Sequence, residues 1–212
     1  MIETVTTSFR AWLVDLDGTL YHPLPVRTAM AFELAASGAR VVPVIRAFRR
    51  QHELVRDAAR VRRENPRLEP TSPYELQLDR TAEVLGRDVP SVRRAVEEWM
   101  LERPGKWLRM FRRRSLLREI EHFRARGGAT ALVSDYPAFG KLKALGASHL
   151  FDIVLANGES PDVTALKPDP ACLLAAAAKL GVRPEECLVI GDRLDADGAA
   201  AHAAKMAFRR IG

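Results

Sequence analysis

The chain has 212 residues, of which 47% are hydrophobic and 28% charged, and its formal net charge is +6. This is the composition of a soluble globular protein with one domain, or one domain and a small insert. The longest apolar run, residues 171–178, is too short to cross a bilayer, so no membrane partner is expected. Residues 1–7 lack the basic flank and apolar stretch of a signal peptide.

The two cysteines and the uneven charge add to this description. Cys172 and Cys187 lie among apolar residues, so we expect buried free thiols, which suit a reducing cytoplasm. Residues 21–114 contain 20 Lys and Arg against 12 Asp and Glu, a balance of +8, whereas the rest of the chain carries −2. The middle segment is therefore a separate electrostatic unit.

The first half of the chain predicts one strand followed by helices. Residues 11–14 are apolar and indicate a buried strand. Ser72, Pro73 and Glu75 are typical of a helix start with a capping box. Prolines, glycines and helical periodicity predict four helices, over residues 25–37, 43–65, 73–86 and 90–102. Residues 22–112 are thus expected to form a mainly helical insert.

The second half alternates helices with strands. Helices are predicted over residues 115–126, 139–145, 170–180 and 196–205. Strands are predicted over residues 129–133, 153–156, 187–190 and 206–211. This alternation favours an α/β fold with a doubly wound parallel sheet, in which ligands bind beyond the carboxyl ends of the strands. Asp15, Ser134 and Asp192 each follow such an end.

Asp15 and Asp17 are the first candidates for chemistry. One residue separates them at the end of a buried strand, and Gly18 and Thr19 then break that strand. Two carboxylates in this position repel each other and resist burial. A cation site with a nucleophile accounts for the arrangement, although aspartates are also common in ordinary loops.

The stretch from Asp15 to Leu20, Asp-Leu-Asp-Gly-Thr-Leu, resembles the first motif of the haloacid dehalogenase (HAD) superfamily. The other motifs of that family follow in order: Ser134 after the second strand, Lys167 before Pro168, and Asp192 to Asp197 after a late strand. The resemblance covers residues 10–20 and about 115–212. It implies a HAD-like core, residues 1–21 and 113–212, with strand order 3-2-1-4-5, and a helical cap over residues 22–112.

The resemblance also implies roles for the motif residues. Asp15 is expected to be the nucleophile that forms an aspartyl-phosphate, and Asp17 the general acid and base. An aspartate at position 17 matches the phosphatases and mutases of the family, not its dehalogenases or P-type ATPases. Ser134 and Lys167 are expected to bind the substrate phosphate. For Ser134, a helix N-cap is the alternative role.

An all-oxygen metal site is the further implication. The Asp15 carboxylate, the Asp17 carbonyl and Asp192 are the expected ligands of Mg²⁺, with Asp197 in support through water or Lys167. A role for Asp195 is less clear. We therefore expect a Mg²⁺-dependent phosphomonoester hydrolase for a small phosphorylated metabolite.

Two rival functions remain open at this point. A phosphomutase of the same superfamily would use the same residues and return the phosphoryl group to substrate. A nucleic-acid-binding or scaffold protein would use the basic insert through Arg46, Arg49, Arg50, Arg56, Arg60, Arg62 and Arg63. These arginines are spread around a helix with few aromatic residues between them, so nucleic acid is the less favoured partner. The sequence leaves open whether the protein is a monomer or a homodimer.

Two finer expectations concern single residues. The family often has Gly where Lys205 stands, and a left-handed cap there would cost Lys about 1 kcal/mol. Insert arginines are also expected to recognise a second acidic group on the substrate, since guanidinium pairs with carboxylate through two bonds. Arg27, Arg46 and Arg109 are the candidates for this role.

Overall fold

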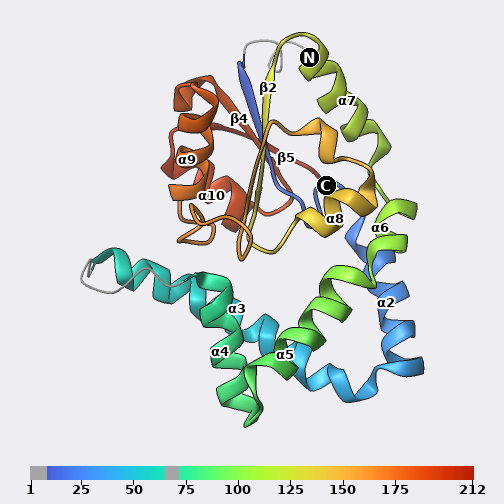
Figure 1. The fold of residues 1–212 in the computed structure, drawn as a ribbon. Coiled ribbons are helices and arrows are strands. Elements are labelled where there is room, and N and C mark those ends of the chain that lie inside the picture. Colours follow the sequence, from blue (N-terminus) through green and yellow to red (C-terminus); the bar gives the residue numbers. More distant parts are fainter. Residues whose placement is uncertain (1–8, 65–71) are drawn as a thin grey trace.

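The structure, a computed structural model, describes residues 9–64 and 72–212, and for residues 57–64 it describes the backbone alone. Its centre is a parallel sheet of five strands in the order β3-β2-β1-β4-β5, which confirms the predicted order (Figure 1). The strands are β1 (Ala11–Val14), β2 (Ala129–Ser134), β3 (Ile153–Ala156), β4 (Cys187–Gly191) and β5 (Ala207–Arg210).

Helices cover both faces of this sheet, since every residue of the central strand β1 is buried. Trp12 and Val14 share one apolar cluster with α7 and α8, whereas Ala11 and Leu13 share another with α9 and α10. The covering helices are α7 (Arg114–Ala125), α8 (Phe139–Leu145), α9 (Ala171–Leu180) and α10 (Ala199–Ala203). Short helical turns are η3 (Ser148–Leu150), η4 (Pro184–Glu186) and η5 (Leu194–Gly198).

Between β1 and α7 the chain forms what we call the helical insert, residues 23–110. Its elements are α2 (Pro23–Ser37), η1 (Ala39–Val41), α3 (Val42–Glu64), α4 (Pro73–Leu85), α5 (Val89–Val96), η2 (Glu97–Glu102) and α6 (Gly105–Met110). The chain leaves and returns at the same place, where an isolated bridge joins Tyr21 to Arg112 and the Arg113 N–H donates to the Leu20 carbonyl (2.8 Å). The insert is therefore connected to the core by two adjacent segments of the chain, beside the carboxyl ends of the strands (Figure 1).

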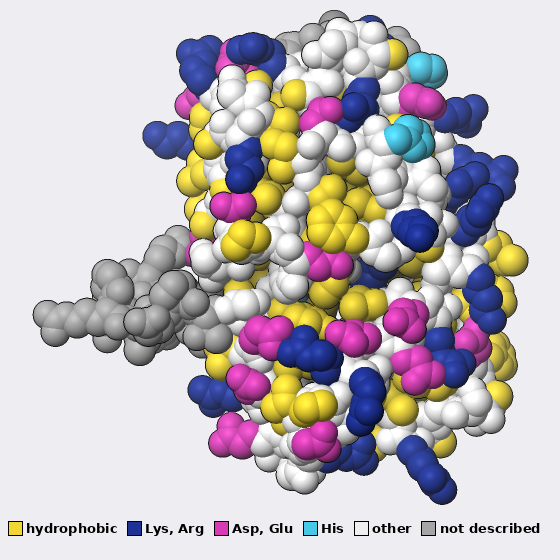
Figure 2. Space-filling model, viewed as in Figure 1, with side chains coloured by type: hydrophobic (Ala, Val, Ile, Leu, Met, Phe, Trp, Pro, Cys, Tyr) yellow, Lys and Arg dark blue, Asp and Glu magenta, His cyan; other side chains and the backbone are white. Residues whose placement is uncertain are grey.

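The insert has an apolar cluster of its own. Val44 and Phe48 of α3 pack with Leu78 of α4 and with Val92 and Val96 of α5, and all five are buried. On the face shown in Figure 2, acidic and basic side chains are intermixed over the part where Figure 1 places α3, α4 and α5. The excess positive charge of the insert thus forms no continuous basic stripe on that face.

The helix start predicted at Ser72 and Pro73 is confirmed for α4, but the predicted capping box is wrong. Ser72 is the N-cap residue, but its side chain accepts no hydrogen bond from the helix. Glu75 instead forms an ion pair with Arg93 of α5, so it does not reach back to the cap. The ion pair between α4 and α5 thus takes the place of the capping box within α4.

Two helix predictions differ from the structure, and one helix was not predicted. The predicted helix over residues 90–102 is α5 followed by the π-helical turn η2, and that over residues 196–205 is the π-helical turn η5 followed by α10. Pro104, which follows the predicted helix over residues 90–102, is the N-cap residue of the unpredicted α6, since proline is tolerated at a helix start. The predicted end of α3 at Asn65, and the side chains of Arg60, Arg62 and Arg63, lie outside what the structure describes.

Among the described residues 9–64 and 72–212, no single helix is long and apolar enough to cross a membrane. One helix pair, Pro23–Ser37 with Ala39–Arg56, meets that length and composition only when it is joined across a bend of 109°. Cys172 and Cys187 are buried free thiols, as predicted.

Lys205 has the left-handed backbone that the sequence suggested. It follows α10 with φ of 58° and is the one described non-glycine residue with a positive φ. The left-handed conformation costs a residue with a Cβ about 1–2 kcal/mol. Glycine avoids that cost, but its greater loss of conformational entropy on folding costs about 0.5–1 kcal/mol of free energy relative to alanine.

We therefore predict that Lys205→Gly stabilises the protein by about 0.5–1 kcal/mol, as measured by urea unfolding. Lys143→Gly is the matched control, because Lys143 is an exposed lysine in the last turn of α8. It should lose about 1 kcal/mol, since glycine is unfavourable in a helix. A loss of stability in both variants would contradict the strain assigned to Lys205.

Candidate active site

Asp15 lies directly beyond β1, at the edge where the carboxyl ends of the strands meet. Its Oδ2 accepts a hydrogen bond from the Thr19 hydroxyl (2.9 Å), and its Oδ1 accepts one from Lys167 Nζ (2.6 Å). Burial raises the pKa of Asp15 to about 8, although Lys167 opposes the rise. The carboxylate is thus held in place at both oxygens but needs more positive charge to stay ionised at neutral pH.

Lys167 supplies one buried positive charge to two acids. Its Nζ donates to Asp15 Oδ1, to Asp197 Oδ1 (2.6 Å) and to the Val133 carbonyl (3.2 Å). Burial lowers the pKa of Lys167, but the surrounding acids, Asp15 first, outweigh it and raise the pKa well above its usual range. The lysine is therefore a fixed ammonium with all three of its donors used.

Asp15, Asp192 and Asp197 form a group of acids that fits a metal ion. One carboxylate oxygen from each lies within 4.8 Å of the others. Burial, and then Asp197, raise the pKa of Asp192. Three carboxylates against one ammonium leave an excess of negative charge on hard oxygen donors, which is the environment that Mg²⁺ prefers.

Gly18 allows this close approach. Its φ of +90° is one that glycine adopts readily, and a Cβ at this position would lie 2.2 Å from Asp192 Oδ2. Gly191 has the same role on the opposite side, where a Cβ would lie 2.4 Å from Asp197 Cγ. The two glycines of the predicted motifs thus make room for the acids beside them.

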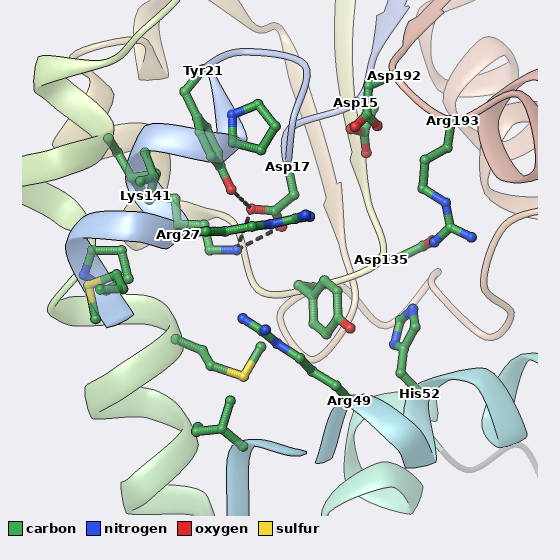
Figure 3. Close-up of a pocket in the computed structure, with 18 of the residues that line it drawn as sticks. Asp15, Asp17, Tyr21, Arg27, Arg49, His52, Asp135, Lys141, Asp192 and Arg193 are labelled. Carbon is green, nitrogen blue, oxygen red and sulfur yellow. Dashed lines mark hydrogen bonds and ion pairs between the residues drawn. The ribbon is translucent and has the colours of Figure 1, made fainter. Parts of the chain in front are cut away.

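Asp17 is held apart from this acidic group. Its Oδ1 accepts a hydrogen bond from the Tyr21 hydroxyl (2.6 Å), and both of its oxygens accept from Lys141 Nζ (2.7 Å each) (Figure 3). Burial would raise the pKa of Asp17, but Lys141 and Tyr21 outweigh it and the pKa is lowered. The two aspartates of one motif therefore have pKa values shifted in opposite directions.

Ser134 is buried, and its side chain is engaged within its own loop. The hydroxyl donates to the Tyr136 carbonyl (2.8 Å) and accepts from the Tyr136 N–H (3.2 Å). It does not cap α8, whose first N–H groups donate instead to the Glu159 carboxylate. In this structure the Ser134 hydroxyl therefore neither caps a helix nor is free to contact a phosphate.

A cavity of about 560 Å³ lies between the edge of the sheet and the helical insert. It reaches Asp15, Asp17, Lys167, Asp192 and Asp197 on the sheet side. Arg27 of α2 and Arg49 of α3 line it on the insert side, whereas Arg46 and Arg109 are not among its lining residues. Figure 3 shows Arg27 and Arg49 pointing into this space.

Sequence analysis assigned no role to Lys141, Tyr21 or Asp135. Lys141 is buried seven residues after Ser134, where a single sequence suggests only a solvated charge. Asp135 accepts a hydrogen bond from the Lys167 backbone N–H (3.1 Å) and lines the cavity. Adjacency to predicted motif residues is the one signal that marks Asp135 and Tyr21.

A family model for the haloacid dehalogenase-like hydrolases matches residues 9–205. The chain belongs to the haloacid dehalogenase-like hydrolases. It is 31% identical to a phosphoserine phosphatase from Thermus thermophilus, over 87% of this chain and 81% of that protein. It is 42% identical to a glyceraldehyde 3-phosphate phosphatase from Methanopyrus kandleri, over 34% of this chain and only 29% of that protein.

Solved structures show the same fold at low sequence identity. An L-2-haloacid dehalogenase from Xanthobacter autotrophicus, with chloropropionic acid covalently bound, has a TM-score of 0.65 and 15% identity over 96% of this chain and 77% of its own. A HAD phosphatase from Thermococcus onnurineus has a TM-score of 0.56 and 22% identity over 96% of this chain and 86% of its own. The architecture of this HAD chain is thus shared along nearly its whole length.

The pairing of Lys141 with Asp17 leads to a prediction about ionisation. Lys141→Met removes the ammonium that favours the carboxylate, so the pKa of Asp17 should rise. Side-chain ¹³C NMR measures this, with the resonance assigned by its absence in Asp17→Asn. Lys143→Met, on the exposed face of α8, is the control and should leave the pKa of Asp17 unchanged. An unchanged pKa in Lys141→Met would show that the ion pair does not control Asp17.

Proposed function

We propose that this protein is a Mg²⁺-dependent phosphomonoester hydrolase that acts through an aspartyl-phosphate on Asp15. The observation that carries the proposal is the placement of Asp15 at the cavity, fixed by Lys167 and Thr19 beside Asp192 and Asp197. A buried carboxylate with both oxygens oriented is suited to attack a phosphorus atom. The two curated relatives are both named as phosphatases, which supports the same chemistry.

Asp15, Asp192 and the Asp17 carbonyl are the residues that would hold the metal, which would offset the negative charge of the phosphate and of Asp15. Lys167 neutralises part of the charge on Asp15 and keeps its Oδ1 in one orientation. Asp197 in turn orients Lys167. Ser134 would bind a phosphoryl oxygen after exchanging its hydrogen bond to the Tyr136 carbonyl for one to the substrate.

Asp17 has to exchange partners for its part in the reaction. As general acid it would donate a proton to the leaving oxygen, and as general base it would take one from water. Its contacts with Lys141 and Tyr21 favour the ionised form, which is the form that a base needs. Protonation of the leaving group therefore requires Asp17 to move from Lys141 toward the substrate.

We propose that the core comprises residues 1–21 and 113–212 and that residues 22–112 form a cap over the site. Three contacts join the two parts in support of this. The Tyr74 N–H donates to Asn157 Oδ1 (3.0 Å), the His52 ring stacks on that of Tyr136 (4.4 Å between centroids), and Arg193 faces Glu53. A cap closed in this way would exclude water from the acyl-phosphate and select the leaving group.

A small phosphorylated metabolite is the proposed substrate class, in a cytoplasmic enzyme. No observation favours a phosphomutase over a hydrolase. None favours nucleic acid either, since Arg56 of α3 is paired with Glu53 and charges of both signs are intermixed on the face in Figure 2.

The metal requirement is directly testable. Hydrolysis of p-nitrophenyl phosphate should stop with EDTA and return with Mg²⁺, because carboxylates alone cannot approach an anionic phosphate. Asp192→Asn should raise the Mg²⁺ concentration needed for half-maximal rate. Full activity after exhaustive chelation would refute the metal requirement.

The division of roles between Asp15 and Asp17 gives another prediction. Asp15→Asn should abolish turnover and trapping by beryllium fluoride, whereas Asp17→Asn should retain trapping and slow turnover by about 10²–10⁴-fold. Asp162→Asn, at an exposed acid paired with Lys179, is the control and should keep full activity. Near-normal turnover in Asp15→Asn would exclude it as the nucleophile.

A further inference from the structure

Arg27 and Arg49 are two charges of the cavity that the proposed chemistry does not use. Asp15 and Asp197 pair with Lys167, and Asp17 pairs with Lys141. The one acid that lines the cavity from the insert, Glu53, is engaged by Arg56 (2.7 Å) and faces Arg193 (3.9 Å). None of the ion pairs between described residues includes Arg27 or Arg49.

The two guanidinium groups approach one region of the cavity from different helices. Figure 3 shows Arg27 extending from α2 below Asp17 and Arg49 extending from α3 toward the same space. Burial raises the pKa of Tyr21 and of Tyr136, and Arg27 and Arg49 respectively oppose that rise, so each guanidinium lies within electrostatic reach of a phenol that lines the site. Two convergent guanidinium groups are suited to a carboxylate or phosphate, which they bind through paired hydrogen bonds.

The remaining wall on the insert side is apolar. It is formed by side chains of α2, α3, η2 and α6, namely Val26, Met30, Leu34, Ile45, Trp99 and Leu108. A polar leaving group would leave this wall in contact with water, whereas a hydrocarbon portion would cover it. The volume of about 560 Å³ also exceeds what a phosphate and a metal ion need.

The same wall has no acid free to receive an ammonium group. Glu53 is its one acid among the described lining residues, and it is already engaged by arginines. Bringing an ammonium group beside Arg27 and Arg49 would place like charges together, which is unfavourable. A zwitterionic leaving group such as serine therefore matches the insert side of this cavity poorly, since the further lining acid Asp135 lies on the sheet side, where its Oδ1 accepts the Lys167 backbone N–H.

We infer that the preferred substrate is a phosphate monoester whose leaving group carries an apolar portion and a second acidic group, bound by Arg27 and Arg49, and no ammonium group. This inference rests on the proposed function, because it identifies the leaving group of that reaction. It also separates this chain from its Thermus relative, whose name specifies phosphoserine. The second acid is a carboxylate or a second phosphate, and guanidinium groups recognise both.

The test is a set of alkyl phosphates that differ by one group at a time. Propyl phosphate has no second acid, 3-(phosphonooxy)propanoate adds a carboxylate, and O-phosphoserine adds an ammonium group to that. Propane-1,3-diyl bisphosphate replaces the carboxylate with a phosphate, and 6-(phosphonooxy)hexanoate lengthens the apolar chain. We expect kcat/KM to be at least about tenfold higher for 3-(phosphonooxy)propanoate than for propyl phosphate or O-phosphoserine, and higher still for the hexanoate. The bisphosphate decides which acid is preferred.

Arginine variants assign the effect to the two residues. Arg27→Met and Arg49→Met should each lower kcat/KM for the acidic substrates by about tenfold or more, mainly through KM, and change that for propyl phosphate by less than about twofold. Arg46→Met is the matched control, because Arg46 is an exposed arginine of α3 that does not line the cavity, and it should change neither. Thermal unfolding by circular dichroism confirms that each variant is folded.

Two results would overturn the inference while leaving the proposed function in place. One is turnover of O-phosphoserine equal to or faster than that of 3-(phosphonooxy)propanoate. The other is an equal loss on propyl phosphate and on the acidic esters in the folded Arg27 and Arg49 variants. Failure of the wild-type protein to hydrolyse any ester with Mg²⁺, p-nitrophenyl phosphate included, would instead overturn the proposed function and the inference with it.

Discussion

The buried ammonium of Lys167 is the interaction on which the site depends. Its Nζ contacts Asp15 beyond β1, the Val133 carbonyl of β2 and Asp197 of η5. With the segment of Lys167 itself, four segments that are remote in sequence meet at one atom. Removing one partner of a buried ion pair typically costs about 3–5 kcal/mol, because the other charge is left uncompensated. Lys167 therefore fixes the position of the acids as much as it offsets their charge.

One ammonium for three acids leaves the site short of positive charge, and Asp15 and Asp17 therefore have different electrostatic surroundings. Asp15 shares Lys167 with Asp197, and burial raises its pKa. Asp17 has Lys141 and Tyr21 to itself, and its pKa is lowered. Two carboxyl groups with pKa values pushed apart are typical of sites in which one acts as nucleophile and the other transfers protons.

The helical insert adds to the cavity two guanidinium groups that form no ion pair with a described residue. The core surrounds Asp15 with acids, whereas the insert contributes Arg27 and Arg49 and an apolar wall. A phosphate ester held there would have its phosphoryl group at the sheet and its leaving group against the insert. In the proposed reaction, the chemistry and the selection of substrate would belong to different parts of the chain, which are joined where Tyr21 meets Arg112.

The sequence by itself determined the sheet and most of the acidic site. Alternating apolar strands and helices predicted the parallel fold, and because the carboxyl ends of parallel strands share one edge, Asp15, Ser134 and Asp192 could be expected together. Lys167 and Asp197 were expected there only through the resemblance to the HAD motifs. Only the tertiary structure decided the partners of Asp17 and Ser134, the helix α6 and which arginines face the cavity. Lys141 lies 124 residues from Asp17, and Arg27 and Arg49 converge from separate helices, so their positions depend on packing between elements that no local pattern records.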